Sequence, residues 1–275
     1  MTAAELNLHV NLDGLPSRMQ GVLKAATNLV AIGLNSTTSI TPESFVIPDL
    51  PMHHRYDSNN QWTLDAAKSI WEYWILRNGF RDIAEATSGL LEEIQRVLSY
   101  WQLSFLQSER GELLGDDWNE LVVKKGRQFH KRTLPQKIEF FEKQYQFSVD
   151  LDLLRQVLSI NAARNCFVHR GGVVAAEDAG FSGVLDLEWS ALVALAIVDG
   201  KEQEVHPPQI FEGGTKIGVA TRPRSKRVPI VESLEVNATE FAQMGWTLYI
   251  FSQSCAHRLE SYGRERGIEF NLTAI

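Results

Sequence analysis

The residues with the clearest chemical potential lie at 164–172, where the sequence reads RNCFVHRGG. At about 100° per residue along a helix, Asn165 and His169 fall on one face, and Arg164 lies on its flank. An arginine fork fits a phosphate with two hydrogen bonds, and a histidine exchanges a proton near neutral pH. Together they could cleave a ribose–phosphate backbone without a metal ion. The histidine would handle the proton of the 2′-hydroxyl or of the leaving group, and the arginine would stabilise charge on the phosphorus oxygens.

The element that must position this motif is a helix predicted over 151–170. A turn at 148–150 precedes this helix, and Gly171 and Gly172 stop it, because glycine is favoured just past a helix end. The apolar positions that we expect in the core are Leu154, Val157, Leu158 and Ile160. We therefore expect Arg164 and His169 to reach one shared polar cleft at the end of a buried helix.

A strong helical pattern also runs over 64–101, with apolar residues spaced by three and four. Thr63 caps it, and Gly79 or Gly89 is a candidate bend, so one or two amphipathic helices are predicted. The tryptophans of this stretch, Trp71, Trp74 and Trp101, are expected in the core.

Two more helices are predicted, one at about 17–33 and one at 134–147, where a proline occupies the first turn. The segment 35–61 is rich in Ser, Thr, Pro and Asn and is expected to be a long loop with a short extended piece at 45–47. The segment 107–133 also reads as irregular, because it combines glycines with scattered charge.

The apolar pattern becomes that of strands in several places, which we predict at 1–12, 184–198, 201–205, 216–220, 228–236 and 268–272. Asp199-Gly200 is a two-residue hairpin signal, and TRPRSKR is expected to join a second hairpin. Asn237 or Thr239 then caps a final helix. Since both chain ends are strand-like, they can share a small antiparallel sheet with the hairpins.

The motif at 164–172 resembles the R-polar-x-x-x-H signature of the HEPN superfamily, the higher eukaryote and prokaryote nucleotide-binding domains. Two stretches before it, LPQKIEFFEKQY and WILRNGFRDIAEATSGLLEE, also resemble that family. The resemblance covers roughly 62–172, with the final helix over 238–266 as a candidate fourth bundle member. The β-rich stretch 184–236 departs from a minimal bundle of this kind.

This resemblance implies a helical bundle that forms a homodimer through its motif helices, and an endoribonuclease that needs no metal ion or other cofactor. Many such proteins belong to toxin–antitoxin, antiviral, stress or RNA-processing systems, so an antitoxin partner is a further expectation. By the same resemblance Arg164 and His169 would be catalytic, and Asn165 would be the supporting polar residue.

Two other interpretations of these residues stay open. Asn165 and His169 could tie the helix end to a neighbouring loop while Arg164 pairs with an acid, which is a purely structural role. The bundle could also bind RNA or a nucleotide without cleaving it, or act as a dimerising scaffold, because a fold does not by itself establish catalysis.

The densest positive segment comprises Lys124, Lys125, Arg127, His130, Lys131 and Arg132. Its five lysines and arginines are the predicted RNA-binding residues, since they could neutralise phosphates. The alternative is a solvated loop balanced by Asp116, Asp117 and Glu120. A second cluster, expected as a charged hairpin tip that protects a sheet edge, comprises Arg222, Arg224, Lys226 and Arg227.

The composition narrows the function classes. The 275 residues include 27 Lys and Arg against 34 Asp and Glu, a formal net charge of −7, so any nucleic-acid contact must be local. The two cysteines, Cys166 and Cys255, exclude a disulfide framework and a multi-cysteine zinc site, and His53-His54 lacks neighbouring ligands. The N-terminus does not resemble a secretory signal, and no apolar run approaches about 20 residues, which favours a cytoplasmic protein without membrane contact.

We therefore predict an α+β protein that is mostly α: an antiparallel HEPN-like helical bundle with a small antiparallel sheet. The expected segments are an N-terminal strand, helix and loop over 1–61, the bundle over 62–172, a hairpin region over 173–236, and a final helix and strand over 237–275. We expect them to pack as one domain.

Overall fold

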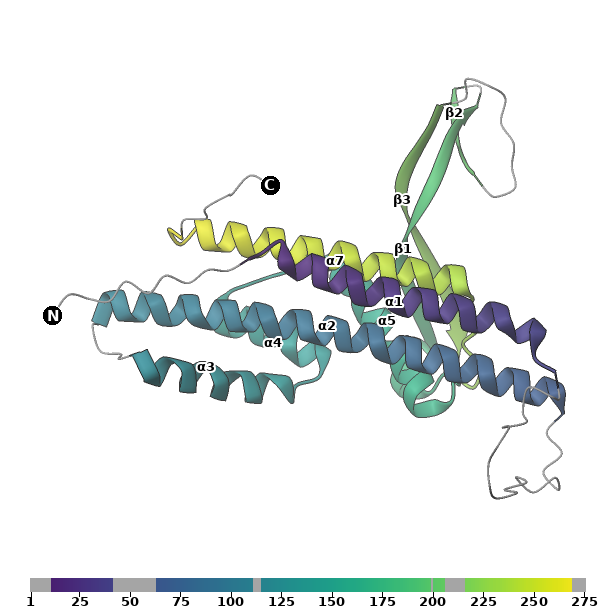
Figure 1. Ribbon diagram of the computed structural model, residues 1–275, viewed down its shortest axis with the longest axis horizontal. Helices are drawn as coiled ribbons and strands as arrows, with labels where there is room; N and C mark the ends of the chain where they lie inside the picture. The colour runs from purple at the N-terminus through teal and green to yellow at the C-terminus, as the bar shows by residue number, and fades with distance from the viewer. Residues whose placement is uncertain (1–10, 42–62, 111–114, 199, 206–215, 269–275) are drawn as a thin grey trace, which may run out of the picture.

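A computed structural model of the chain describes residues 11–41, 63–110, 115–198, 200–205 and 216–268. Long helices run side by side through the molecule, and a three-stranded antiparallel sheet crosses them (Figure 1). The mostly helical α+β class is thus confirmed. The strands expected at 1–12 and 268–272 and the extended piece at 45–47 fall almost wholly outside the described residues.

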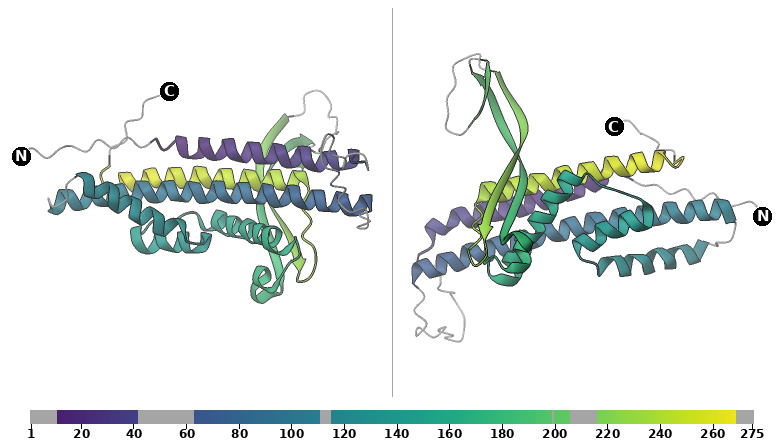
Figure 2. Two further views of the ribbon diagram at one scale, coloured as in Figure 1. Left: turned by 60° about the horizontal axis from the view of Figure 1, so that its bottom comes forward. Right: turned by 180° about the vertical axis from the view of Figure 1, so that it is seen from behind.

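Three long helices form the main layer: α1 (Gly14–Ser36), α2 (Leu64–Arg110) and α7 (Ala238–Arg264). Three shorter helices lie against this layer: α3 (Gly115–His130), α4 (Leu134–Tyr145) and α5 (Leu151–Arg170). The short helix α6 (Ala176–Ala179) packs instead on α5 and the sheet. Single 3₁₀ turns follow α1 at Thr37–Ser39 and α6 at Gly180–Ser182. Helix α5 contacts α2 and α7, and the sheet packs on α5 and α7 (Figure 2). None of the helices in the described ranges is both long and apolar enough to cross a membrane.

Helix α2 is one continuous element rather than two, and it runs without interruption through both Gly79 and Gly89. Thr63 caps it, because its side-chain oxygen accepts a hydrogen bond from the Ala66 amide at 3.2 Å. A Cβ on Gly79 would lie 2.4 Å from Val30 of α1 and 2.9 Å from Phe241 of α7. The glycine therefore allows a close approach of three helices.

The prediction of irregular structure over 107–133 is wrong, because most of this segment is helical. Val122 and Phe129 stand seven positions apart on α3, and both are buried. This periodic contact with α2 outweighs the cost of about 1 kcal/mol for Gly126 inside the helix. The basic segment accordingly lies on α3 and the turn into α4.

The sheet has the order β2–β1–β3, with β1 (Val184–Val198) between β2 (Lys201–Glu204) and β3 (Lys216–Pro229). The hairpin expected between β1 and β2 is confirmed. The second hairpin is not formed, since β3 continues unbroken and pairs with β1 from Val184↔Pro229 to Ile197↔Lys216. Pro223 is tolerated because β3 is an edge strand.

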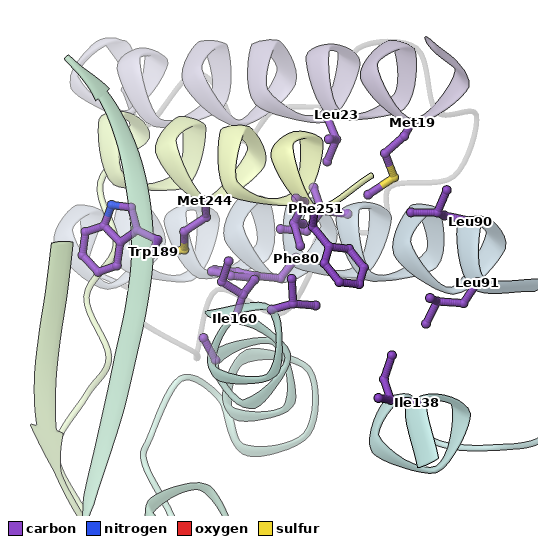
Figure 3. Close-up of a cluster of buried hydrophobic side chains, with 14 of the residues drawn as sticks. Met19, Leu23, Phe80, Leu90, Leu91, Ile138, Ile160, Trp189, Met244 and Phe251 are labelled. Carbon is purple, nitrogen blue, oxygen red and sulfur yellow. The ribbon is translucent and has the colours of Figure 1, made fainter. Parts of the chain in front are cut away.

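The core is shared by helices and sheet from distant parts of the chain. Figure 3 shows buried side chains from α1, α2, α4, α5, β1 and α7, labelled Met19, Leu23, Phe80, Leu90, Leu91, Ile138, Ile160, Trp189, Met244 and Phe251. The inner half of β1 belongs to this core, whereas the outer half of the hairpin projects from the body (Figure 1). Helix α5 is thereby held between the sheet and α2.

Candidate functional site

Helix α5 begins and ends as local chemistry predicts. Asp150 caps it, because the side-chain Oδ1 accepts a hydrogen bond from the Leu153 amide at 2.8 Å. Gly171 ends it with φ +68°, a conformation that favours glycine. Val157 and Ile160 are buried as expected, but Leu154 and Leu158 are only half-buried, and Leu154 packs against the edge of the core.

The three motif residues meet at the C-terminal end of α5. Arg164 Nη1 donates a hydrogen bond to Asn165 Oδ1 at 2.9 Å and lies 3.1 Å from His169 Nε2. Because a guanidinium has donors only, the second contact requires an unprotonated Nε2. The expectation that Arg164 and His169 lie together is confirmed, and one arginine nitrogen bridges the other two side chains.

The Arg164 side chain is half-buried, and its hydrogen-bond donors differ in whether they have partners. The Nε atom is buried and has no hydrogen-bond partner among the described residues. Burial lowers the pKa of the Arg164 guanidinium from its ordinary value; Glu85 counteracts this shift and Arg81 adds to it. The buried Nε is thus an unsatisfied donor, and a phosphate oxygen could satisfy it only if the Arg164 side chain shifted on binding.

Two contacts fix the end of α5 in place. Arg170 forms an ion pair with Asp178 of α6, whose carboxylate also accepts a hydrogen bond from the Ala175 amide at 3.1 Å. On the other side, the Tyr73 hydroxyl of α2 donates to the Phe167 carbonyl at 2.7 Å. The motif backbone is thus tied to two neighbouring elements, which restricts where Arg164 and His169 can move.

The motif residues stand at the junction of three cavities. An inner cavity of about 310 Å³ between α2, α4 and α5 is lined by Arg164 and Asn165. A helix-end cavity of about 450 Å³ is lined by Asn165 and His169. A third, of about 280 Å³, lies between α2 and α5 and is lined by Arg164 with Trp74. Arg164 and His169 therefore do not line the same one of these three cavities, and their direct contact connects the cavities on either side.

The predicted RNA-binding segment reaches this site through one residue. Arg132 lines the inner cavity, and its guanidinium lies 4.7 Å from the centre of the Phe140 ring. Lys124, Arg127 and Lys131 are exposed elsewhere on α3 and the following turn. Lys125 instead points into the packing against α2, where it donates to Gln102 at 3.1 Å, and burial lowers the pKa of its amine.

The second basic cluster is not a hairpin tip, because its residues lie within β3 and pair with acids. Each member has a partner: Arg222 with Glu202, Arg224 with Glu204, Arg227 with Asp186, and Lys226 with Glu240. The acidic partners lie on β1, β2 and α7, and these pairs leave little unbalanced positive charge.

Two features of the site were missed by sequence reasoning. Trp71 and Trp74 are not in the core: they are 36% and 52% exposed, and only Trp101 of the three is buried. Lys137 is 2% exposed and donates to Ser88 and Glu92 at 2.5 and 2.7 Å, in the wall of the inner cavity. No residue spacing marks either feature, because both depend on which helix faces are covered.

No family model matches this chain, and comparisons with curated proteins and with solved structures gave no significant match. Within the described ranges, no group of three or more His, Cys, Asp and Glu side chains gathers as a metal site would require. Cys166 and Cys255 are buried thiols, and burial raises the pKa of Cys166 to about 11. The cluster of Arg164, Asn165 and His169 is therefore the candidate functional site.

Proposed function

We propose that this protein is a metal-independent endoribonuclease of the HEPN type, with Arg164 and His169 as catalytic residues and Asn165 as their supporting polar residue. The observation that carries the proposal is the 3.1 Å separation of Arg164 Nη1 and His169 Nε2 beside open cavities. Cleavage of a ribose–phosphate chain needs a hydrogen-bond donor to the phosphate and a proton acceptor, and here these two groups are in contact.

In the proposed reaction the 2′-oxygen attacks phosphorus as His169 Nε2 takes the hydroxyl proton. The new 2′-O–P bond replaces the P–5′-O bond, and the leaving 5′-oxygen takes a proton from water. Arg164 stabilises charge on the non-bridging oxygens. For this, Nη1 must exchange His169 for phosphate, which frees Nε2 at the moment when the substrate is bound.

We further propose a homodimer through the motif helices. A stripe along α5, in line with Asn165 and His169, carries the exposed Leu151 and the half-buried Leu154, Leu158 and Ala162, of which Leu154 and Ala162 also touch the core. A two-fold axis along this stripe would bury it and place two copies of the site side by side. Light scattering that shows a monomer at micromolar concentration would refute this arrangement.

The second candidate is a non-catalytic RNA-binding or dimerising scaffold. One observation favours it: Asn165 and His169 already occupy both hydrogens of Arg164 Nη1, as a structural tie would. Membership of a toxin–antitoxin or defence system, an antitoxin partner and a cytoplasmic location remain parts of the proposal, and they rest on the sequence resemblance.

The test is cleavage of labelled single-stranded RNA in the presence of EDTA. We expect the wild type to cleave, and His169→Ala to lose about 10²–10⁴-fold in rate. The matched control is His257→Ala, because His257 is exposed on α7, outside the lining of all three cavities. Equal cleavage by the wild type and His169→Ala, or an unfolded His169→Ala protein, would refute the catalytic assignment.

A further inference from the structure

We propose that the third cavity binds single-stranded RNA. This cavity, which we call the Trp74 groove, is lined by Trp74, Arg77, Arg81 and Arg164. The proposal deepens the proposed function by naming the form of the substrate and its path, and its RNA-binding part stands without catalysis. It also places the main RNA contact on α2 and not on the basic segment of α3.

The aromatic part of the Trp74 groove is preformed. The rings of Trp71 and Trp74 stack, with centroids 5.5 Å apart and an interplanar angle of 15°. Trp71 Nε1 donates to the Gly33 carbonyl of α1 at 3.1 Å, which holds the inner ring in place. Trp74 is the more exposed of the two and lines the groove. A fixed, exposed indole offers a face on which an unpaired base stacks.

The charge of the Trp74 groove favours a polyanion. Its lining holds three arginines, Arg77, Arg81 and Arg164, against one acid, Glu85. Glu85 is engaged by Arg81 in an exposed pair at 2.9 Å. Arg77 is exposed and forms no ion pair with any described residue. Two positive charges therefore remain in excess on a protein whose formal net charge is −7.

The geometry connects the Trp74 groove to the catalytic pair. Trp74, Arg77 and Arg81 are spaced by three and four along α2, so they fall on one helix face. Arg164 closes the groove from α5 and touches His169 at 3.1 Å. A strand whose base stacks on Trp74 would have its phosphates along Arg77 and Arg81, and the backbone would next meet Arg164.

Single-stranded RNA fits the Trp74 groove better than a duplex, because stacking on Trp74 requires an unpaired base. The basic segment lacks the same combination. Among the aromatic side chains that the structure describes there, Phe129 is buried within the segment and Phe140 is covered by Arg132. An acidic peptide is the competing occupant for the arginines, and it has no aromatic base to place on Trp74.

The test measures anisotropy of a short fluorescein-labelled pyrimidine RNA, with the proteins carrying His169→Ala so that the probe stays intact. We expect Trp74→Ala to weaken binding roughly 5- to 100-fold, and Trp74→Phe to retain most of the affinity. Because Trp74 is exposed, the fold should survive, which a thermal melt checks. An RNA duplex of the same sequence should compete poorly.

A salt titration separates phosphate contacts from a general loss of charge. Arg77→Ala should reduce the slope of log K against log salt by about 0.7 for a single strand. Arg96→Ala is the matched control, since Arg96 is also exposed on α2 but lies outside the Trp74 groove. Its slope should be unchanged.

The outcomes distinguish this inference from the proposed nuclease. Unchanged binding in both Trp74→Ala and Arg77→Ala would overturn the Trp74 groove even if the wild type cleaves RNA. Equal affinity for duplex and single strand, or preferred binding of an acidic peptide, would also overturn it. Weakened binding in both variants without any cleavage by the wild type would support the groove and refute the nuclease.

Discussion

Replacing Gly79 by alanine tests the packing that sets the position of α2. A Cβ at this position would lie 2.4 Å from Val30 Cγ2 and 2.9 Å from Phe241 Cζ. Neither neighbour can move into solvent, because Val30 and Phe241 are both fully buried. The extra methyl therefore forces the three helices apart or pushes side chains away from their preferred rotamers.

The expected magnitude follows from two opposing effects. Alanine favours the helix over glycine by about 1 kcal/mol, whereas overpacking of a close-packed core costs about 1–3 kcal/mol or more. With contacts this short we expect the upper part of that range, and a net loss of about 1–2 kcal/mol. Gly89→Ala is the matched control, because Gly89 lies on the same helix with nothing within 4 Å of its Cβ position. That variant should be about 1 kcal/mol more stable than the wild type.

Equilibrium unfolding in urea measures both variants under the same conditions. The predicted result is a lower midpoint for Gly79→Ala and a higher midpoint for Gly89→Ala, with similar slopes. A Gly79→Ala protein as stable as Gly89→Ala would refute the close approach of α1, α2 and α7. A loss in both variants would instead mean that helix propensity does not apply to α2 at these positions.

Three further predictions concern the site. The double variant Arg164→Ala/His169→Ala should cleave RNA little more slowly than either single variant, because the effects of substituting groups that act as a unit do not add. Additive losses in single-turnover rates would contradict a joint role. Glu92→Gln should destabilise the protein by about 3 kcal/mol, because it leaves the 2%-exposed ammonium of Lys137 without its counter-charge. Lys137→Met should destabilise it by clearly less, because it removes the buried charge itself. The reverse order of the two variants in urea unfolding would contradict this. Burial alone would raise the pKa of Glu92, but hydrogen bonds from Lys137 and His130 outweigh it and lower the pKa. The Glu92 contribution should therefore be present above the unfolded-state pKa and be lost as the pH falls through the folded-state pKa, and Glu92→Gln should show a weaker loss of stability on acidification.

Local signals predicted the elements that position the motif. Helix α5 begins after Asp150 and ends at Gly171, because N-capping and the left-handed C-cap depend on single residue types. The same logic failed for β3, because TRPRSKR contains the residues of a turn and is extended only through its pairing with β1 and its ion pairs to neighbouring elements. The same logic failed to predict α3, because Gly126 and the charged residues outnumber the few buried apolar positions, Val122 and Phe129.

At the site, helical spacing placed Asn165 and His169 on one face, but it could not show that Arg164 bridges them, which depends on side-chain rotamers. The exposure of Trp74 was mispredicted for a related reason. Aromatic residues at helical spacing indicate a buried face, but which face of α2 is covered depends on α1, α5 and α7. Spacing within one helix carries no information about its neighbours.

The close approach at Gly79 gives a physical reason for the orientation of the Trp74 groove. At about 100° per residue, Gly79 lies about 140° around α2 from Trp74, whereas Arg81 lies within about 20° of it. Packing the glycine face against Val30 and Phe241 therefore turns Trp74 and Arg81 away from α1 and α7 and toward Arg164 on α5. A larger side chain at 79 would shift the face that carries Arg81 relative to Arg164. The fold and the proposed RNA path thus depend on the same helix crossing.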